Sequence, residues 1–509
     1  MDVARPDIFW IVADEYRCDG IGAYGNPWIR TPNLDGLASE GVIFTNAFCQ
    51  VPTCVASRAS FLSGRYPHRV GNLWYRATSD SVPFVPEYFA AAGYRTVCIG
   101  KEDHRRARSP FLERHPGFAD GGWEADPFQL REEFRHRERE LGILRRYTTP
   151  GKPLIVAGTN PLPPEEAETG RLVARTLSYL RNYDRRQPLF LHLSCIYPHT
   201  PVLPPRPFDA MYDPAGLAFP SDGAESAGRT DLELEVMHGL CTVEGMRGED
   251  IRKMRAHYYG LCSYVDSRLG ALFAYLRENW GRPYLVVFHA DHGTLLGEHG
   301  LHEKFSLYEQ ARRVPLIVAG TGIPGGRRIE SLVELVDLAP TLMRYAGLPI
   351  DAAMGLQGLD LLPLMHDQSL PWRDAAFCEL QPMHVRDLEK RPHLARFIRT
   401  EIRGARGCDY PALKAAAESE GLALEALEDA PPGSPYSFWL PVLKTIRTAR
   451  YVLTVRAVWL PGQGGDYMGS LYDLEEDPLE MRNVFHDGKY RQVAAGLIER
   501  LRRWDQETS

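Results

Sequence analysis

The fold is indicated most directly by YLVVFHADHG, residues 284–293, in which an apolar run is followed by Asp291 and His292. A short, continuous apolar run is typical of a parallel strand that helices cover on both faces. We therefore predict a buried strand at residues 284–289, with ionisable side chains directly after it. In open α/β sheets, ligands bind beyond the carboxyl ends of such strands.

Similar runs recur along the chain and alternate with helical patterns. The other predicted strands are residues 8–13, 96–99, 189–193 and 314–319. The predicted helices are residues 33–40, 85–92, 166–183 and 252–279. Strands that alternate with helices favour an α/β architecture with a mostly parallel central sheet.

Ionisable residues follow four of these predicted strands. They are Asp14 and Glu15, Lys101, His199, and the pair Asp291 and His292. Because the carboxyl ends of parallel strands lie at one edge of a sheet, we expect a single site there. Each residue alone would also be compatible with a helix cap or a solvated side chain.

Length and composition exclude several classes of protein. The chain has 509 residues, which favours a large α/β domain and a smaller second one. Hydrophobic residues make up 44% and charged residues 25%, as in ordinary globular proteins. The net charge of −7 offers no basic excess for nucleic acid. We expect no nucleic-acid partner.

The N-terminus and the cysteines favour a cytoplasmic protein. The apolar run at 8–13 continues directly into Asp14 and Glu15, unlike a secretory signal. No run approaches the roughly 18 apolar residues that span a bilayer. The nine cysteines are scattered and form no CxxC pair. We therefore expect reduced thiols and no membrane association.

The pattern differs from the rest of the chain in residues 104–165 and in the C-terminal part. Residues 104–165 are rich in Arg, His and Pro without clean periodicity, and are interpreted as an insertion. Strand-like patterning resumes at 445–457 and an amphipathic helix is predicted at 490–504. We predict a catalytic domain at 1–380 and a smaller C-terminal domain at 381–509, with an antiparallel sheet and a terminal helix.

The most specific segment is CVASRASFLSGR, residues 54–65. On a helix, a spacing of four places Cys54 and Arg58 one turn apart on the same face. A helix N-terminus favours an anionic group through its free amides and dipole. Taken alone, the pattern is more typical of a structural cysteine at the start of a helix than of a catalytic one.

This segment resembles the signature of the sulfatase family, in the alkaline phosphatase superfamily. Blocks at 26–35, 336–342 and 471–478 resemble further family blocks, so the resemblance covers nearly the whole chain. It implies an alkaline-phosphatase-like α/β/α sandwich. It also implies that Cys54 becomes formylglycine, through a formylglycine-generating or radical maturation enzyme. Ala56 is a departure, since the family most often has Pro there. Phosphonate monoester hydrolases and choline sulfatases are also similar.

The resemblance implies one divalent cation, with Asp14, Glu15, Asp291 and His292 as ligands. Carboxylate oxygens favour calcium or magnesium, and the histidine admits manganese. Calcium is the first expectation. Glu15 is a departure, because this position in the family usually holds Asp or Gln.

The resemblance also assigns catalytic and substrate-binding roles. The expected set is Cys54 as nucleophile, Arg58 and Lys101 as its contacts, Lys101 and Lys304 on the transferring oxygens, His199 on the leaving group, His104 as base and Asn72 in the substrate site. His104 lies three residues after Lys101, whereas the family commonly places this histidine two after the lysine. A histidine suits general acid catalysis because it titrates near neutrality.

The expected activity is hydrolysis of a small-molecule or glycan sulfate ester, releasing sulfate. Two alternatives stay open: a phosphonate monoester or phosphodiester hydrolase with the same nucleophile, and a catalytically silent protein that binds sulfated glycans. The basic run at 105–108 is interpreted either as a solvated face or as a contact for a polyanionic glycan. The identity of the ester and homo-oligomerisation stay open.

Overall fold

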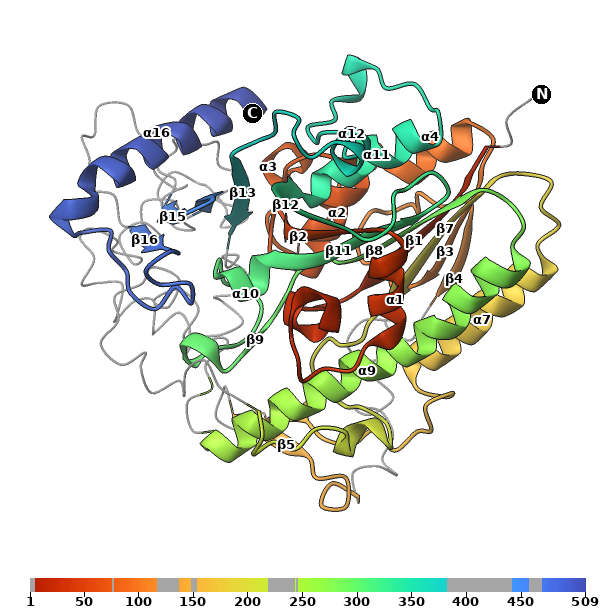
Figure 1. Ribbon diagram of the computed structural model, residues 1–509, viewed down its shortest axis with the longest axis horizontal. Coiled ribbons are helices and arrows are strands. Elements are labelled where there is room, and N and C mark those ends of the chain that lie inside the picture. The colour runs from red at the N-terminus through yellow and green to blue at the C-terminus, as the bar shows by residue number, and fades with distance from the viewer. Residues whose placement is uncertain are drawn as a thin grey trace, which may run out of the picture.

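The computed structural model describes residues 5–75, 77–116, 137–147, 153–217, 243, 246–381, 442–456 and 469–509. Its centre is an eight-stranded sheet with the order β12-β2-β11-β8-β1-β7-β3-β4 (Figure 1). The strands are β1 (Asp7–Ala13), β2 (Val42–Phe48), β3 (Arg95–Gly100), β4 (Glu113–Pro116), β7 (Leu189–Cys195), β8 (Tyr284–Ala290), β11 (Arg313–Gly320) and β12 (Arg327–Glu334).

All five strands predicted from apolar runs are confirmed. β1 pairs in parallel with β7 and β8, and all seven of its residues are buried. β11 is antiparallel to both of its neighbours, β2 and β8. The sheet is therefore mixed and mostly parallel, as the alternation of strands and helices predicts. β2, β4 and β12 were not among the predicted strands.

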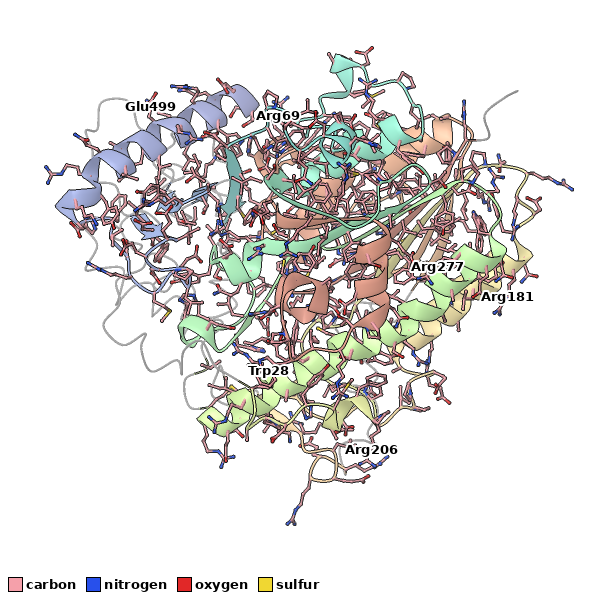
Figure 2. The ribbon with its side chains drawn as sticks, in the orientation of Figure 1. Trp28, Arg69, Arg181, Arg206, Arg277 and Glu499 are labelled. Carbon is pink, nitrogen blue, oxygen red and sulfur yellow. The ribbon has the colours of Figure 1, made fainter. Side chains whose placement is uncertain are left out.

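Helices cover both faces of the sheet (Figure 1). One layer contains α1 (Pro32–Glu40), α7 (Glu168–Asn182) and α9 (Gly248–Asn279), and the other contains α2 (Cys54–Ser63), α4 (Val85–Ala91) and α11 (Leu338–Tyr345). The four predicted helices correspond to α1, α4, α7 and α9. Arg181 of α7 and Arg277 of α9 are exposed on this layer (Figure 2), and Arg277 pairs with Glu40 of α1 at 3.1 Å.

A second sheet is antiparallel, with the order β13-β14-β15-β16. Its strands are β13 (Ala375–Leu380), β14 (Leu443–Thr448), β15 (Tyr451–Arg456) and β16 (Gly469–Asp473). Helix α16 (Arg491–Thr508) packs on it, and the Trp504 ring stacks on Phe377 with centroids 4.5 Å apart. The domain division at residue 380 stays a prediction.

Short helices and strands occur elsewhere in the described chain. They are α3 (Pro67–Val70), α10 (Glu309–Arg312), α12 (Leu362–His366), β5 (Leu144–Tyr147), β6 (Pro153–Ala157), β9 (Leu295–Leu296) and β10 (His302–Glu303). β5 and β6 pair with each other inside the insertion predicted at 104–165, of which 117–136 and 148–152 lie outside the described residues. Within the described ranges, no helix has the length and apolar character needed to cross a membrane.

Candidate active site and metal centre

The side chains predicted to form one site converge at the carboxyl ends of the central strands. Asp14 follows β1, Lys101 follows β3 and Asp291 follows β8, and all three strands belong to the adjacent run β8-β1-β7-β3 of the sheet. All three side chains are buried. The fold thus brings Asp14 and Asp291, which are 277 positions apart in the sequence, to the same edge of the sheet.

Helix α2 delivers the cysteine to this edge. Cys54 is its first residue, and all ten residues of the helix are buried. The helix ends at Gly64, which has a left-handed φ of 66°. A Cβ there would lie 2.6 Å from the Cβ of Ala339, so only glycine fits both the conformation and the contact. This close fit sets the position of α2 and therefore of Cys54.

Arg58 links the two acidic residues of the site. Its Nε donates to Asp291 Oδ2 at 2.9 Å, and one Nη donates to Asp14 Oδ2 at 3.2 Å. Its other Nη donates to Ser194 Oγ, inside β7, at 2.7 Å. Burial alone would lower the pKa of Arg58, but Asp291 and Asp14 raise it above its usual range. Arg58 is therefore a permanent cation that fixes both carboxylates.

Four buried side chains form a candidate cation site. One donor atom from each of Asp14, Cys54, Asp291 and His292 lies within 4.8 Å of the others. The Nδ1–H of His292 donates to the carbonyl of Gly293 at 2.9 Å. The other ring nitrogen, Nε2, is therefore the one that can bind a metal. Two carboxylates and an imidazole are donors that calcium, magnesium or manganese accept, so the residues present fit a divalent cation.

Cys54 lies within this group. Its Sγ is 3.2 Å from His292 Nε2 and 3.5 Å from Asp14 Oδ1. Burial and Asp14 raise the pKa of the thiol, whereas Lys101, Lys304 and His292 lower it, and the net result is about 6. A thiol in these surroundings is largely ionised near neutrality.

Glu15 lies beside the cation site but makes different contacts. It belongs to a second group with Asp14 and His199. Its carboxylate forms an ion pair with Lys304 and lies 3.3 Å from His199 Nε2. Burial would raise the pKa of Glu15, but His199 and Lys304 lower it. The assignment of Glu15 as a metal ligand stays a prediction.

Two lysines and His199 complete the group around the cysteine. The Nζ of Lys304 lies 2.5 Å from His199 Nε2. Lys101 forms an ion pair with Asp14 and lies 3.3 Å from Asp103. Asp14, Glu15, Lys101 and Lys304 are all buried, so their charges act in a medium of low dielectric.

His104 and Asn72 form hydrogen bonds within their own loops. His104 Nε2 lies 2.7 Å from Glu102 Oε1, and its Nδ1 accepts from the Arg106 backbone at 3.1 Å. Both ring nitrogens are therefore engaged within the loop that follows β3. Asn72 donates to Thr78 Oγ1 at 3.0 Å. The roles of His104 as base and of Asn72 as a substrate contact stay predictions.

Three neighbours of the site were not singled out from the sequence. Tyr75 places its hydroxyl 3.9 Å from Cys54 Sγ. Ser57 Oγ donates to the carbonyl of Asp291 at 2.6 Å, and Ser194 accepts from Arg58. Ser57 could have been chosen because it lies within the cysteine segment. Tyr75 and Ser194 carry no spacing or charge signal.

The comparison with protein families identifies the class. A model of the family described as Sulfatase matches residues 6–348, which include every residue of the candidate site. The chain therefore belongs to the sulfatase family, and it is a hydrolase whose relatives act on sulfuric esters.

Individual relatives agree with this assignment. An arylsulfatase of Clostridium perfringens is 30% identical over 73% of this chain and 80% of its own length. An iduronate 2-sulfatase of Mus musculus is 27% identical over 97% of this chain and 93% of its own. The structure of a phosphonate monoester hydrolase of Agrobacterium radiobacter superimposes with a TM-score of 0.73 at 22% identity, covering 99% of this chain and 96% of that one. The last likeness concerns the fold.

Proposed function

We propose that this protein hydrolyses a sulfate ester with a formylglycine derived from Cys54 and one divalent cation. The observation that carries the proposal is the position of Cys54 Sγ, 3.2 Å from His292 Nε2 at the N-terminus of α2 and within the candidate cation group. The sulfur atom stands where the formylglycine oxygen would lie. Asp14, Asp291 and His292 are the proposed ligands, with Glu15 as a fourth.

The divalent cation and the formylglycine would supply part of the chemistry. A bound cation acts as a Lewis acid, and hydrated formylglycine offers a hydroxyl for attack on sulfur. The side chains of this chain would do the rest. Arg58, held by Asp14 and Asp291, fixes the orientation of the nucleophile and its carboxylate neighbours.

Lys101 and Lys304 would bind the oxygens of the transferring group. Both are buried beside the cysteine, where a fixed cation stabilises developing negative charge more strongly than in water. His199 would protonate the leaving alcohol through Nε2 in its imidazolium form. Burial alone would lower the pKa of His199, but Glu15 raises it and so favours that form. His104 would serve the later release of sulfate as a base by taking up the proton of the formylglycine hydroxyl, which requires one ring nitrogen to leave Glu102 or Arg106.

The substrate class that fits best is a sulfated small molecule or glycan. The relatives are named for an aryl sulfate and for iduronate 2-sulfate. A phosphonate monoester is the second candidate, because the fold superimposes on a phosphonate monoester hydrolase along 99% of the chain. Both reactions would use the same nucleophile.

The test is a direct comparison of 4-nitrophenyl sulfate and a matched phenyl phosphonate, with protein produced alongside a maturation enzyme and supplied with calcium. We expect sulfate turnover that Cys54→Ala abolishes and that Cys49→Ala, at another buried cysteine, retains. Faster phosphonate turnover would favour the second candidate. Turnover of neither ester by protein with confirmed formylglycine and bound metal would contradict the proposal and favour a glycan-binding role.

A further inference from the structure

Three aromatic side chains lie beside the candidate nucleophile. The ring centroids of Trp74 and Phe305 are 4.9 Å apart, and those of Tyr75 and Phe305 are 6.0 Å apart. Trp74 is buried, whereas Tyr75 and Phe305 are partly exposed. Trp74 therefore supports two rings that keep accessible surface.

These rings adjoin the groups that would hold the sulfate. The Tyr75 hydroxyl lies 3.9 Å from Cys54 Sγ, and Lys304 Nζ lies 5.6 Å from the centroid of the Phe305 ring. A substituent attached to a sulfate held at Cys54 and Lys304 would thus meet the Tyr75–Phe305 pair. Aromatic faces are suited to pack against the ring of an aryl group or the apolar face of a sugar.

The backbone around Phe305 is held in an unfavourable conformation. Glu303 and Phe305 have left-handed φ values of 71° and 73°. Such values are uncommon for bulky residues and persist where the surroundings impose them, often at functional sites. Here the backbone N–H of Phe305 donates to the carbonyl of Pro52, two residues before Cys54, at 3.3 Å. The ring is therefore tied to the segment that carries the nucleophile.

Arg105 extends this surface with a positive charge. Its guanidinium lies 5.4 Å from the centroid of the Tyr75 ring and donates to the Tyr75 carbonyl. Arg105 has a left-handed φ of 52°, and Asp103, two residues earlier, has one of 39°. The loop is anchored by its neighbour Arg106, which pairs with Glu87 at 2.8 Å. Arg105 is thus placed over Tyr75 by the loop.

The charge of Arg105 is not neutralised by a carboxylate in the described part of the chain. Lys101 is paired with Asp14 and Lys304 with Glu15. Arg105, in contrast, is exposed and forms no ion pair with a described residue. A guanidinium has donors arranged to bind a carboxylate or a sulfate through two hydrogen bonds.

We propose that Tyr75, Phe305 and Arg105 form a leaving-group subsite, in which the two rings pack against the ring that bears the sulfate ester and Arg105 binds an anionic substituent on it. This inference rests on the proposed function and makes it narrower: the preferred ester carries a second oxyanion, a carboxylate or a second sulfate. Arg105 acts on recognition rather than on the reacting atoms.

The experiment measures kcat/KM for 4-nitrophenyl sulfate, whose only charge is that of its sulfate ester, and for two series of nitrophenyl sulfates that carry in addition either a carboxylate or a second sulfate ortho or meta to the ester. The variants are Arg105→Ala and Arg105→Lys. The matched control is Arg108→Ala, an exposed arginine of the same loop. The readout is kcat/KM for an ester with the additional anionic group divided by kcat/KM for 4-nitrophenyl sulfate. A general loss of folded or matured protein lowers both values equally and cancels in this ratio.

We expect Arg105→Ala to lower this ratio about tenfold through KM, because a charge-assisted pair is lost, and Arg105→Lys to lower it less. Whichever series shows the larger effect identifies the oxyanion. Tyr75→Ala is expected to raise KM for all the esters. An unchanged ratio in Arg105→Ala, or an equal change in Arg108→Ala, would overturn the subsite. Absence of turnover of every ester by the parent protein would instead contradict the proposed function.

Discussion

Arg58 Nε donates to Asp291 Oδ2 at 2.9 Å, and this bond joins helix α2 to the end of strand β8. Both side chains are completely buried. The same guanidinium reaches Asp14 at the end of β1, so one cation holds three elements of the site together. Arg58 is therefore expected to stabilise the fold as well as to orient the groups of the site.

Replacing Arg58 should lower the free energy of unfolding. Arg58→Ala leaves Asp14 and Asp291 buried without their partner, and breaking a buried pair in this way costs about 3–5 kcal/mol. We expect that loss in the free energy of unfolding by urea, in metal-free protein. Arg69→Ala, at an exposed arginine of α3 (Figure 2), is the control and should change stability by less than about 0.5 kcal/mol. Equal stability of Arg58→Ala and the parent would show that the link contributes nothing.

A divalent cation should stabilise the folded protein. A ligand that binds only the native state adds about 2.7 kcal/mol at a concentration one hundred times its dissociation constant. We expect calcium to raise the melting temperature of chelator-treated protein, and Asp291→Asn to remove most of that increase. Asp367→Asn, at an exposed aspartate, should respond like the parent. A similar calcium response in Asp291→Asn would place the cation elsewhere.

Glu168 should make stability depend on pH. This buried carboxylate accepts from the backbone N–H of Ile196 at 2.9 Å, in the loop that leads to His199. Burial raises its pKa from 4.5 to about 7. A carboxyl whose pKa is raised by folding binds more protons in the native state, so its contribution is greatest below pH 4.5 and falls as the pH rises to about 7.

The variant Glu168→Gln isolates this contribution. The difference in pKa corresponds to a change of at most about 3 kcal/mol between the two ends of that range. We expect the free energy of unfolding of the parent, relative to Glu168→Gln, to decrease between pH 5 and pH 7 (about 1.4 kcal/mol per unit at most). Glu166→Gln, at an exposed glutamate two residues earlier, should track the parent. A difference between parent and Glu168→Gln that stays constant across the range would contradict the raised pKa.

The sequence predicts the central strands of the sheet better than the strand β12 at its edge. β1, β3, β7 and β8 are buried on both faces, so they appear as continuous apolar runs. β12 lies at the edge of the sheet, and its mixture of polar and apolar residues, RRIESLVE, does not give such a run. Edge strands are for this reason harder to predict than central ones.

The same distinction applies to the site. Asp14 and Asp291 follow apolar strands, and Arg58 lies at helical spacing from Cys54, so these residues could be selected before the structure was known. Tyr75 lies in an irregular segment after α3 and reaches Cys54 only through the tertiary fold. The pairing of Glu15 with Lys304 depends on an approach of residues 289 positions apart. Local pattern carries no information on such contacts.

In the proposed function, Cys54 becomes an aldehyde-bearing nucleophile. The most direct test of this conversion is mass spectrometry of the peptide containing residue 54, taken from protein purified from its natural host and shown to hydrolyse a sulfate ester. We predict formylglycine at position 54, with labelling by a hydrazide probe that is lost in Cys54→Ala. Full activity in a preparation whose Cys54 is an unmodified thiol would contradict the account.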